Sequence, residues 1–204
     1  MQKIMFDDRF GLTQAVLNGS KTMTRRFENP LYLLPTDIRD DEYMMQTIRE
    51  DSILVERCYK GAKLDSWVIR PRFYLYEEVA IAQRYEDAFH PLDWVKKELY
   101  QKEKGWTNKM FVKPDLMPHQ IRITDYRVER LQNISEDDCL KEGIYVQETL
   151  PKGYAYDATE DKKRKRWWFG TAKKAFEALI NKVSGKGTWE RNPWVIVYSF
   201  ELVK

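Results

Sequence analysis

The chain has 204 residues, enough for one domain with a hydrophobic core or for one domain that carries large insertions. Its composition is globular, with 43% hydrophobic and 33% charged residues, and its acids and bases nearly cancel to a formal net charge of +3. This balance excludes a strong overall field of the kind that marks many nucleic-acid-binding proteins, so any basic binding surface has to be local.

Neither export nor a membrane span is expected. The opening MQKIMFDD is too short in its apolar part and too acidic for a signal peptide, and no run approaches the roughly 18 apolar residues that cross a bilayer. Cys58 and Cys139 lie far apart, and with His90 and His119 they show no C-x-x-C or H-x-x-x-H spacing. We expect a cytoplasmic protein with free thiols, no metal site and no cofactor.

Hydrophobic periodicity and turn residues predict regular elements along most of the chain. In chain order they are a strand at 3–7, helices at 11–18 and near 41–50, strands at 52–57, 67–71 and 78–85, a helix at 91–103, a strand at 120–131, helices at 136–142 and 172–184, and a strand at 193–203.

Four positions mark helix ends in this pattern. Ser135 is an N-cap residue because Asp138 occupies the third helical position after it, and Thr171 is one because it precedes an apolar stripe. Gly19 and Gly143 are C-terminal stops. Because strands from both ends of the chain look central and no linker divides it, we predict a single α+β domain over 1–204. Its sheet would be mixed or a small barrel.

The main candidate for a functional site is the segment NGSKTMTRR, residues 18–26. It places Lys21, Arg25 and Arg26 among three hydroxyl side chains directly after a predicted helix end. Taken alone, these residues could form a solvated turn that caps the free carbonyls of the helix, and Thr24 could simply bond the backbone.

The spacing of Gly19, Lys21, Thr22, Thr24 and Arg26 resembles the G-x-K-T-x-T-x-R signature of ASCH domains, which are relatives of the PUA RNA-binding fold. The segments 127–144 and 189–202 resemble the larger ASCH proteins often carried by phages and prophages. The resemblance covers about the first 26 residues, 66–85, and 117 to the end. It implies a PUA-like small mixed β-barrel with flanking helices, enlarged here by insertions near 28–65 and 86–116.

The resemblance also implies a cleft, lined by the signature loop, for RNA or a nucleoside. Small bacterial members remove the acetyl group from N4-acetylcytidine with the motif lysine, the second motif threonine and a glutamate from a neighbouring strand. Lys21 and Thr24 match the first two. Arg122 stands where the glutamate is expected, while Gln83 and Tyr85 replace another glutamate and a tryptophan of the larger relatives.

Two functions follow from these residues. Arg122 offers a permanent charge for a phosphate, Gln83 can donate and accept, and Tyr85 offers a stacking face. We therefore predict binding of single-stranded RNA or a nucleotide by a cleft that includes Lys21, Thr24, Arg25 and Arg26. The alternative is an amidohydrolase of N4-acetylcytidine, with Thr24 as nucleophile and Lys21 as base.

Three further interpretations stay open. The basic run Lys162, Lys163, Arg164, Lys165 and Arg166 precedes aromatic residues and could contact nucleic acid or form a solvated loop. Arg122 could instead form an ordinary cross-strand ion pair. The protein could also be a phage-encoded module whose insertions bind a protein partner of unknown identity.

Overall fold

The structure of the protein is a computed structural model that describes residues 1–27, 31–33, 53–60, 63–69, 71–147, 153–156 and 169–203. The strands are β1 (Gln2–Ile4), β2 (Met23–Phe27), β3 (Leu31–Leu33), β4 (Ile53–Lys60), β5 (Lys63–Ile69), β6 (Glu78–Ile81), β7 (Gln120–Arg130), β8 (Tyr145–Gln147), β9 (Gly153–Ala155) and β10 (Trp194–Leu202). The α-helices are α1 (Leu12–Leu17), α3 (Tyr85–Ala88), α4 (Trp94–Tyr100), α5 (Glu136–Lys141), α6 (Ala172–Val183) and α7 (Thr188–Arg191). Short 3-10 turns are η1 (Asp8–Phe10), η3 (Lys104–Trp106), η4 (Lys109–Phe111), η5 (Pro114–Leu116) and η6 (Leu131–Asn133).

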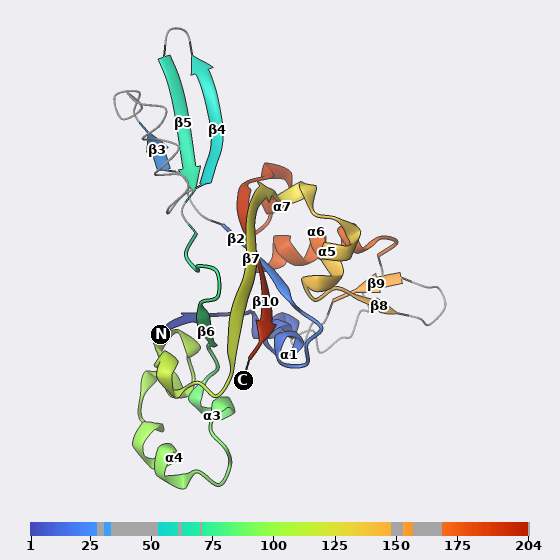
Figure 1. Ribbon diagram of the computed structural model, residues 1–204. Coiled ribbons are helices and arrows are strands. Elements are labelled where there is room, and N and C mark those ends of the chain that lie inside the picture. The colour runs from blue at the N-terminus through green and yellow to red at the C-terminus, as the bar shows by residue number, and fades with distance from the viewer. Residues whose placement is uncertain are drawn as a thin grey trace.

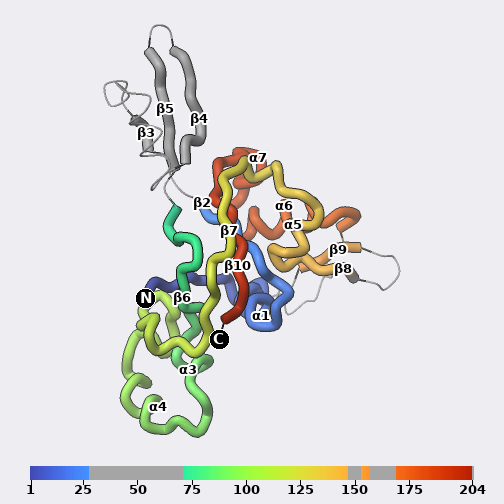
Figure 2. The backbone as a smooth tube through the Cα atoms, viewed as in Figure 1, coloured from blue at the N-terminus to red at the C-terminus, as the bar shows by residue number. Residues whose placement is uncertain are grey.

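A five-stranded mixed sheet organises the described residues (Figure 1), in the order β1-β6-β7-β10-β2. Only β1 and β6 run parallel; the other neighbours are antiparallel. The long strands β7 and β10 lie side by side in the middle, as the backbone tube in Figure 2 shows, and a register shift interrupts their pairing at Ser199. The remaining described strands form two smaller sheets, β3-β5-β4 and β8-β9.

The α+β class predicted from the sequence is confirmed, but a closed barrel is not. Among the described residues the edge strands β1 and β2 do not pair with each other, so the sheet is open. A side-chain contact spans the gap instead, because Arg26 Nη2 donates to the carbonyl oxygen of Met5, which follows β1, at 2.6 Å.

Two hydrophobic clusters form the core. The larger one joins the sheet to α1 and α6 and includes Val16, Ile196 and Phe176, all nearly inaccessible to solvent. The smaller one gathers Tyr85, Phe89 and neighbouring residues of 80–117. Figure 1 shows the matching arrangement: α5 and α6 lie on one side of β7 and β10, α7 lies at the upper end of these strands, and α3 and α4 lie beyond β6.

The local signals for helix ends are confirmed. The Ser135 side chain accepts a hydrogen bond from the backbone of Asp138, and the Thr171 side chain accepts one from the backbone of Lys174. Gly19 and Gly143 both have positive φ, at 77° and 99°. Such backbone conformations favour glycine because a Cβ would crowd the chain.

Other predicted bounds change. The strand predicted at 78–85 ends at Ile81 because Tyr85 begins α3 and fills the smaller cluster. The helix predicted at 91–103 shortens to α4, whose N-cap is Asp93. The helix predicted near 41–50 lies outside the described residues. None of the helices that the structure describes is long and apolar enough to cross a membrane.

Candidate functional site

A cavity of about 420 Å³ lies where the two edges of the sheet fail to pair. We call it the seam cavity. Its volume falls within the range of about 300–1,000 Å³ that small-molecule sites occupy. It is lined by Met5, Phe6, Asp7, Asp8 and Arg9 after β1, Leu12 of α1, Lys21, the β2 residues Thr24, Arg25, Arg26 and Phe27, Lys109, Glu142, and Phe176, Leu179, Ile180, Val183 and Ser184 at α6.

The loop that follows α1 places Lys21 in this cavity. Its backbone N–H donates to the Ala15 carbonyl at 2.8 Å, and the N–H of Thr22 donates to the Lys141 carbonyl at 3.0 Å, which attaches the loop to the end of α5. The chain turns away from α5 at Gly143, where an added Cβ would lie 3.3 Å from Leu12 Cδ2 and 3.7 Å from Lys21 Cδ. Lys21 is thus packed tightly against the helix end.

Glu142 is the carboxylate partner of Lys21. Lys21 Nζ donates to Glu142 Oε2 at 2.6 Å and to the Glu142 carbonyl oxygen at 2.8 Å, and both residues are buried. Burial lowers the pKa of Lys21 below its ordinary value, although the negative charge of Glu142 and its hydrogen bond act in the opposite direction. This carboxylate therefore comes from the end of α5 and not from the strand position that Arg122 occupies.

Arg25 is held by carboxylates. Its Nη1 lies 3.0 Å from Glu142 Oε1, and its Nη2 lies 2.6 Å from Glu129 Oε1 and 3.1 Å from Asp138 Oδ2. Burial by itself would lower the pKa of Arg25, but Glu142 and Glu129 outweigh it and raise the pKa. Arg127 completes the network by donating to both Glu129 and Asp138. The guanidinium of Arg25 therefore joins β2 to β7 and α5, and its side chain is only 1% exposed.

Three other β2 residues line the seam cavity. Thr24 is buried and pairs with Tyr198 in the sheet. Arg26 lies over the Phe6 ring, 5.4 Å from its centroid. Phe27, the last residue of β2, is 40% exposed and offers an accessible ring at the edge of the cavity.

The charges along the cavity are mixed, with a positive excess. Five cationic side chains among the described residues line it against three carboxylates. Two of these carboxylates, Asp7 and Asp8, form ion pairs with Arg9 and Lys109 at 2.7 and 2.8 Å. Apolar side chains from α1 and α6 form the opposite part of the wall. The cavity thus combines an apolar surface with fixed hydrogen-bond donors.

Three predicted site residues do not line the seam cavity. Arg122 lies on the exposed face of the sheet, where Glu78 and Glu201 on the neighbouring strands accept from it at 2.8 and 3.3 Å. The ordinary cross-strand ion pair is therefore the correct interpretation of Arg122, and its predicted place in the cleft is wrong. These two carboxylates raise its pKa, with Glu78 contributing most.

Tyr85 and Gln83 belong to the other cluster. Tyr85 is fully buried, stacks on Phe89 with ring centroids 5.0 Å apart, and accepts a hydrogen bond at its hydroxyl from the backbone of Lys113. Gln83 is half-buried beside Met117, whose sulfur accepts from its backbone N–H. Neither residue is among those that line the seam cavity, so the expected stacking face is not available there. The basic run Lys162, Lys163, Arg164, Lys165 and Arg166 lies outside the described residues.

Comparison of the chain with protein-family models and curated proteins, and of the structure with solved structures, found no match.

Proposed function

We propose that the seam cavity binds a nucleotide or nucleoside, either free or at the end of a single-stranded RNA, and that the chain is an ASCH-type relative of the PUA-like proteins. The main support is the composition of the cavity wall. A nucleobase has flat apolar faces and an edge of donors and acceptors, and the cavity offers apolar side chains with buried cationic donors. Its volume suits one nucleotide better than a longer strand.

Phe27 is the residue that tests this proposal most directly. Its ring is 40% exposed at the cavity and can stack on a base. Stacking on an aromatic side chain contributes about 1–3 kcal/mol per base, equivalent to roughly a fivefold to 150-fold change in Kd. We expect Phe27→Ala to weaken binding within that range.

Calorimetric titration with the four ribonucleoside monophosphates and a short single-stranded RNA measures this effect. Arg122→Gln is the matched control, because it removes a cation outside the cavity and should leave Kd unchanged. Failure of the wild type to bind any of these ligands at about millimolar concentration, near −4 kcal/mol, would refute the proposal. Equal losses in both variants would show that binding occurs elsewhere.

A second function, hydrolysis of N4-acylated cytidine, is supported by one specific contact. Lys21 Nζ donates to Glu142 Oε2, so Glu142 can take the role of the glutamate that the resemblance implies and that Arg122 replaces on its strand. In this reaction the Thr24 hydroxyl attacks the amide carbonyl carbon and its proton passes to a neutral Lys21. The C–N bond then breaks, and the cytidine amine leaves with that proton. Water hydrolyses the threonine ester and releases the carboxylic acid.

Thr24→Val separates this reaction from binding, because it keeps the shape of the side chain and removes the hydroxyl. With N4-acetylcytidine as substrate, acetate release should disappear in Thr24→Val while calorimetric binding of cytidine persists. Arg122→Gln should keep both properties. If the wild type releases no acetate over several hours but binds cytidine, the hydrolase proposal fails and the binding proposal stands.

A further inference from the structure

The seam cavity has a closed end and an open mouth. At the closed end Lys21 and Glu142 are buried. At the mouth the side chains of Asp8 and Arg9 are 52% and 51% exposed. A nucleotide whose base stacks on Phe27 and points its polar edge toward the buried groups leaves its sugar and phosphate at the mouth. The residues of the mouth therefore decide which sugar the cavity accepts.

Asp8 is the carboxylate at the mouth that is held from two sides. The Thr13 hydroxyl of α1 donates to its Oδ1, and Lys109 Nζ lies 2.8 Å from its Oδ2. A carboxylate can accept about four hydrogen bonds, and about half of the Asp8 side chain faces solvent. Its oxygens are thus fixed in place and can still accept from a ligand in the cavity.

The other two carboxylates of the described cavity wall are occupied by neighbouring cations. Asp7 Oδ1 accepts from the backbone N–H and the Nε of Arg9, both at 3.0 Å, and Asp7 Oδ2 accepts from Arg9 Nη2 at 2.7 Å. The Asp7 side chain is also less exposed, at 18%. Glu142 holds Lys21 at the closed end. Asp8 is therefore the carboxylate best placed to meet a ligand.

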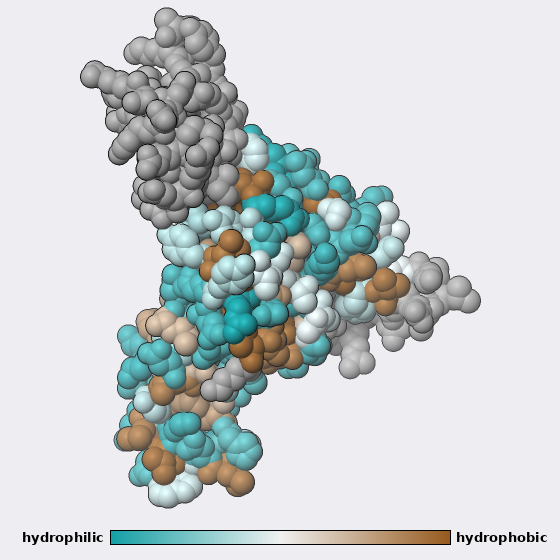
Figure 3. Space-filling model, in the orientation of Figure 1, coloured by the Kyte–Doolittle hydropathy of each residue, from teal (hydrophilic) through white to brown (hydrophobic). Residues whose placement is uncertain are grey.

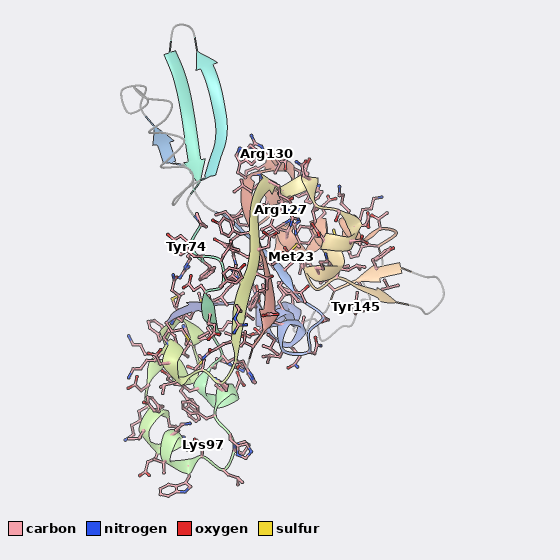
Figure 4. All side chains as sticks on the ribbon, in the orientation of Figure 1. Met23, Tyr74, Lys97, Arg127, Arg130 and Tyr145 are labelled. Carbon is pink, nitrogen blue, oxygen red and sulfur yellow. The ribbon has the colours of Figure 1, made fainter. Side chains whose placement is uncertain are left out.

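Lys109 comes from a small helical lobe, residues 85–117, which contains α3, α4 and the turns η3, η4 and η5. Most of this lobe lies away from the cavity, since in Figure 4 Lys97 of α4 is well apart from Met23 of β2. The space-filling view nevertheless shows the lobe continuous with the rest of the surface, without a gap between them (Figure 3). Its turn η4, which begins at Lys109, returns to the segment around β1.

Two lysines attach η4 to this segment in opposite directions. Lys3 of β1 donates to the carbonyl oxygens of Met110 and Val112 at 2.6 and 2.7 Å, and Lys109 donates to the carbonyl oxygen of Phe6. The Lys109 side chain is only 17% exposed, so it is fixed before a ligand arrives. Fixing a binding group in advance lowers the entropy that binding costs. The lobe thus helps to set the geometry of the cavity mouth.

A carboxylate at this position suits a sugar hydroxyl better than a phosphate. A phosphate beside Asp8 would meet a like charge, whereas a hydroxyl donates to a carboxylate in a short, charge-assisted hydrogen bond. The ribose 2′-hydroxyl is present in a free ribonucleotide and in an RNA strand, and it distinguishes RNA from DNA. We propose, on the basis of the nucleotide binding inferred above, that Asp8 accepts a hydrogen bond from this 2′-hydroxyl and that the seam cavity thereby selects ribonucleotides over 2′-deoxyribonucleotides. Lys109 is the positioning residue for this carboxylate.

Paired titrations of the full-length protein test this assignment. Calorimetry with each ribonucleoside monophosphate and its 2′-deoxy counterpart gives the ratio of the two Kd values. We expect the wild type to bind the ribonucleotide about tenfold to 150-fold more tightly, which is the effect of one hydrogen bond to a charged group. In Asp8→Ala the two Kd values should agree within about twofold, because only the ribonucleotide loses a hydrogen bond. Asp115→Ala, which removes an exposed acid of the lobe outside the cavity, should keep the wild-type ratio.

Lys109→Met provides a second variant should Asp8→Ala fail to fold. It should lower the ratio at least about threefold, and Lys109→Arg, which keeps the charge, should retain most of it. Equal Kd values for the two nucleotides in the wild type would overturn this inference and leave the proposed function standing. A wild-type ratio that persists in Asp8→Ala would also overturn it, and one that persists in Lys109→Met would remove Lys109 from its positioning role. Failure of the wild type to bind either nucleotide would refute the proposed function, and this inference with it.

Discussion

Glu142→Gln tests the electrostatic structure of the candidate site. The substitution keeps the size and shape of the side chain but removes the negative charge that lies 2.6 Å from Lys21 Nζ and 3.0 Å from Arg25 Nη1. Glu142 is 5% exposed and Lys21 is 2% exposed, so water cannot replace the lost carboxylate. Removing one partner of a buried ion pair typically costs about 3–5 kcal/mol. We expect a loss of free energy of unfolding in that range near neutral pH.

The loss should depend on pH in a defined direction. Burial already lowers the pKa of Lys21 in the folded protein, and without the Glu142 charge that pKa falls further. In the unfolded chain Lys21 keeps its ordinary pKa near 10.5. Between the two values the unfolded state binds more protons, so the stability of the variant rises with pH. The cost of Glu142→Gln relative to the wild type should therefore fall as the pH rises from neutral toward 10.5, because Lys21 of the variant can then be buried as the neutral amine.

Urea unfolding followed by tryptophan fluorescence at several pH values measures both effects. Glu78→Gln makes the same chemical change at the exposed pair with Arg122, and an exposed pair contributes only about 0–1 kcal/mol. The reasoning is wrong if Glu142→Gln costs no more than Glu78→Gln. It is also wrong if the cost of Glu142→Gln is large but grows with pH.

Two further predictions concern Gly143 and Cys139. Gly143→Ala should lower the free energy of unfolding in urea by about 1–3 kcal/mol, because φ is +99° and the new Cβ would press on Leu12. Gly170→Ala is the control and should change stability little, since no neighbour lies within 4 Å of its added Cβ. Equal effects of the two substitutions would contradict the strain argument. Burial, followed by the charge of Glu136, raises the pKa of the Cys139 thiol to about 12. In a Cys58→Ser background, Ellman's reagent near pH 8.5 should therefore modify Cys139 about a thousandfold more slowly in the native protein than in urea, and similar rates would refute the burial of the thiol.

The sequence predicted most of the regular structure where the signal was local. Ser135 and Thr171 could be recognised as caps because the acceptor oxygen and the donor N–H lie three residues apart in the chain. The alternation in 120–131 predicted β7 for a related reason, since a strand with one wet face repeats every two residues. Closure of the sheet has no such signal, because it depends on whether two edges far apart in sequence meet.

Glu142 was missed for a physical reason of the same kind. It lies 121 residues from Lys21, and only the packing of α5 beside the loop after α1 brings the two together. The signal that could have found it is the requirement that a buried lysine have an acidic partner. For Arg122, by contrast, a local signal in the sequence was sufficient but was outweighed by the resemblance. It was expected in the cleft because it stands where the resemblance places a glutamate, but its alternation with apolar neighbours already placed it on the wet face, where Glu78 and Glu201 pair with it.

The open sheet and the site are consequences of the same arrangement. A hydrogen-bonded ladder between β1 and β2 would occupy the gap that forms the seam cavity. An edge strand without such a ladder needs other attachments, and Arg25 supplies them by joining β2 to β7 and α5 through three carboxylates. Arg26 then makes one hydrogen bond across the gap to Met5. The two arginines of the segment 18–26 therefore have different functions. Arg25 fixes the wall of the cavity, and Arg26 spans the gap between β2 and the residue that follows β1.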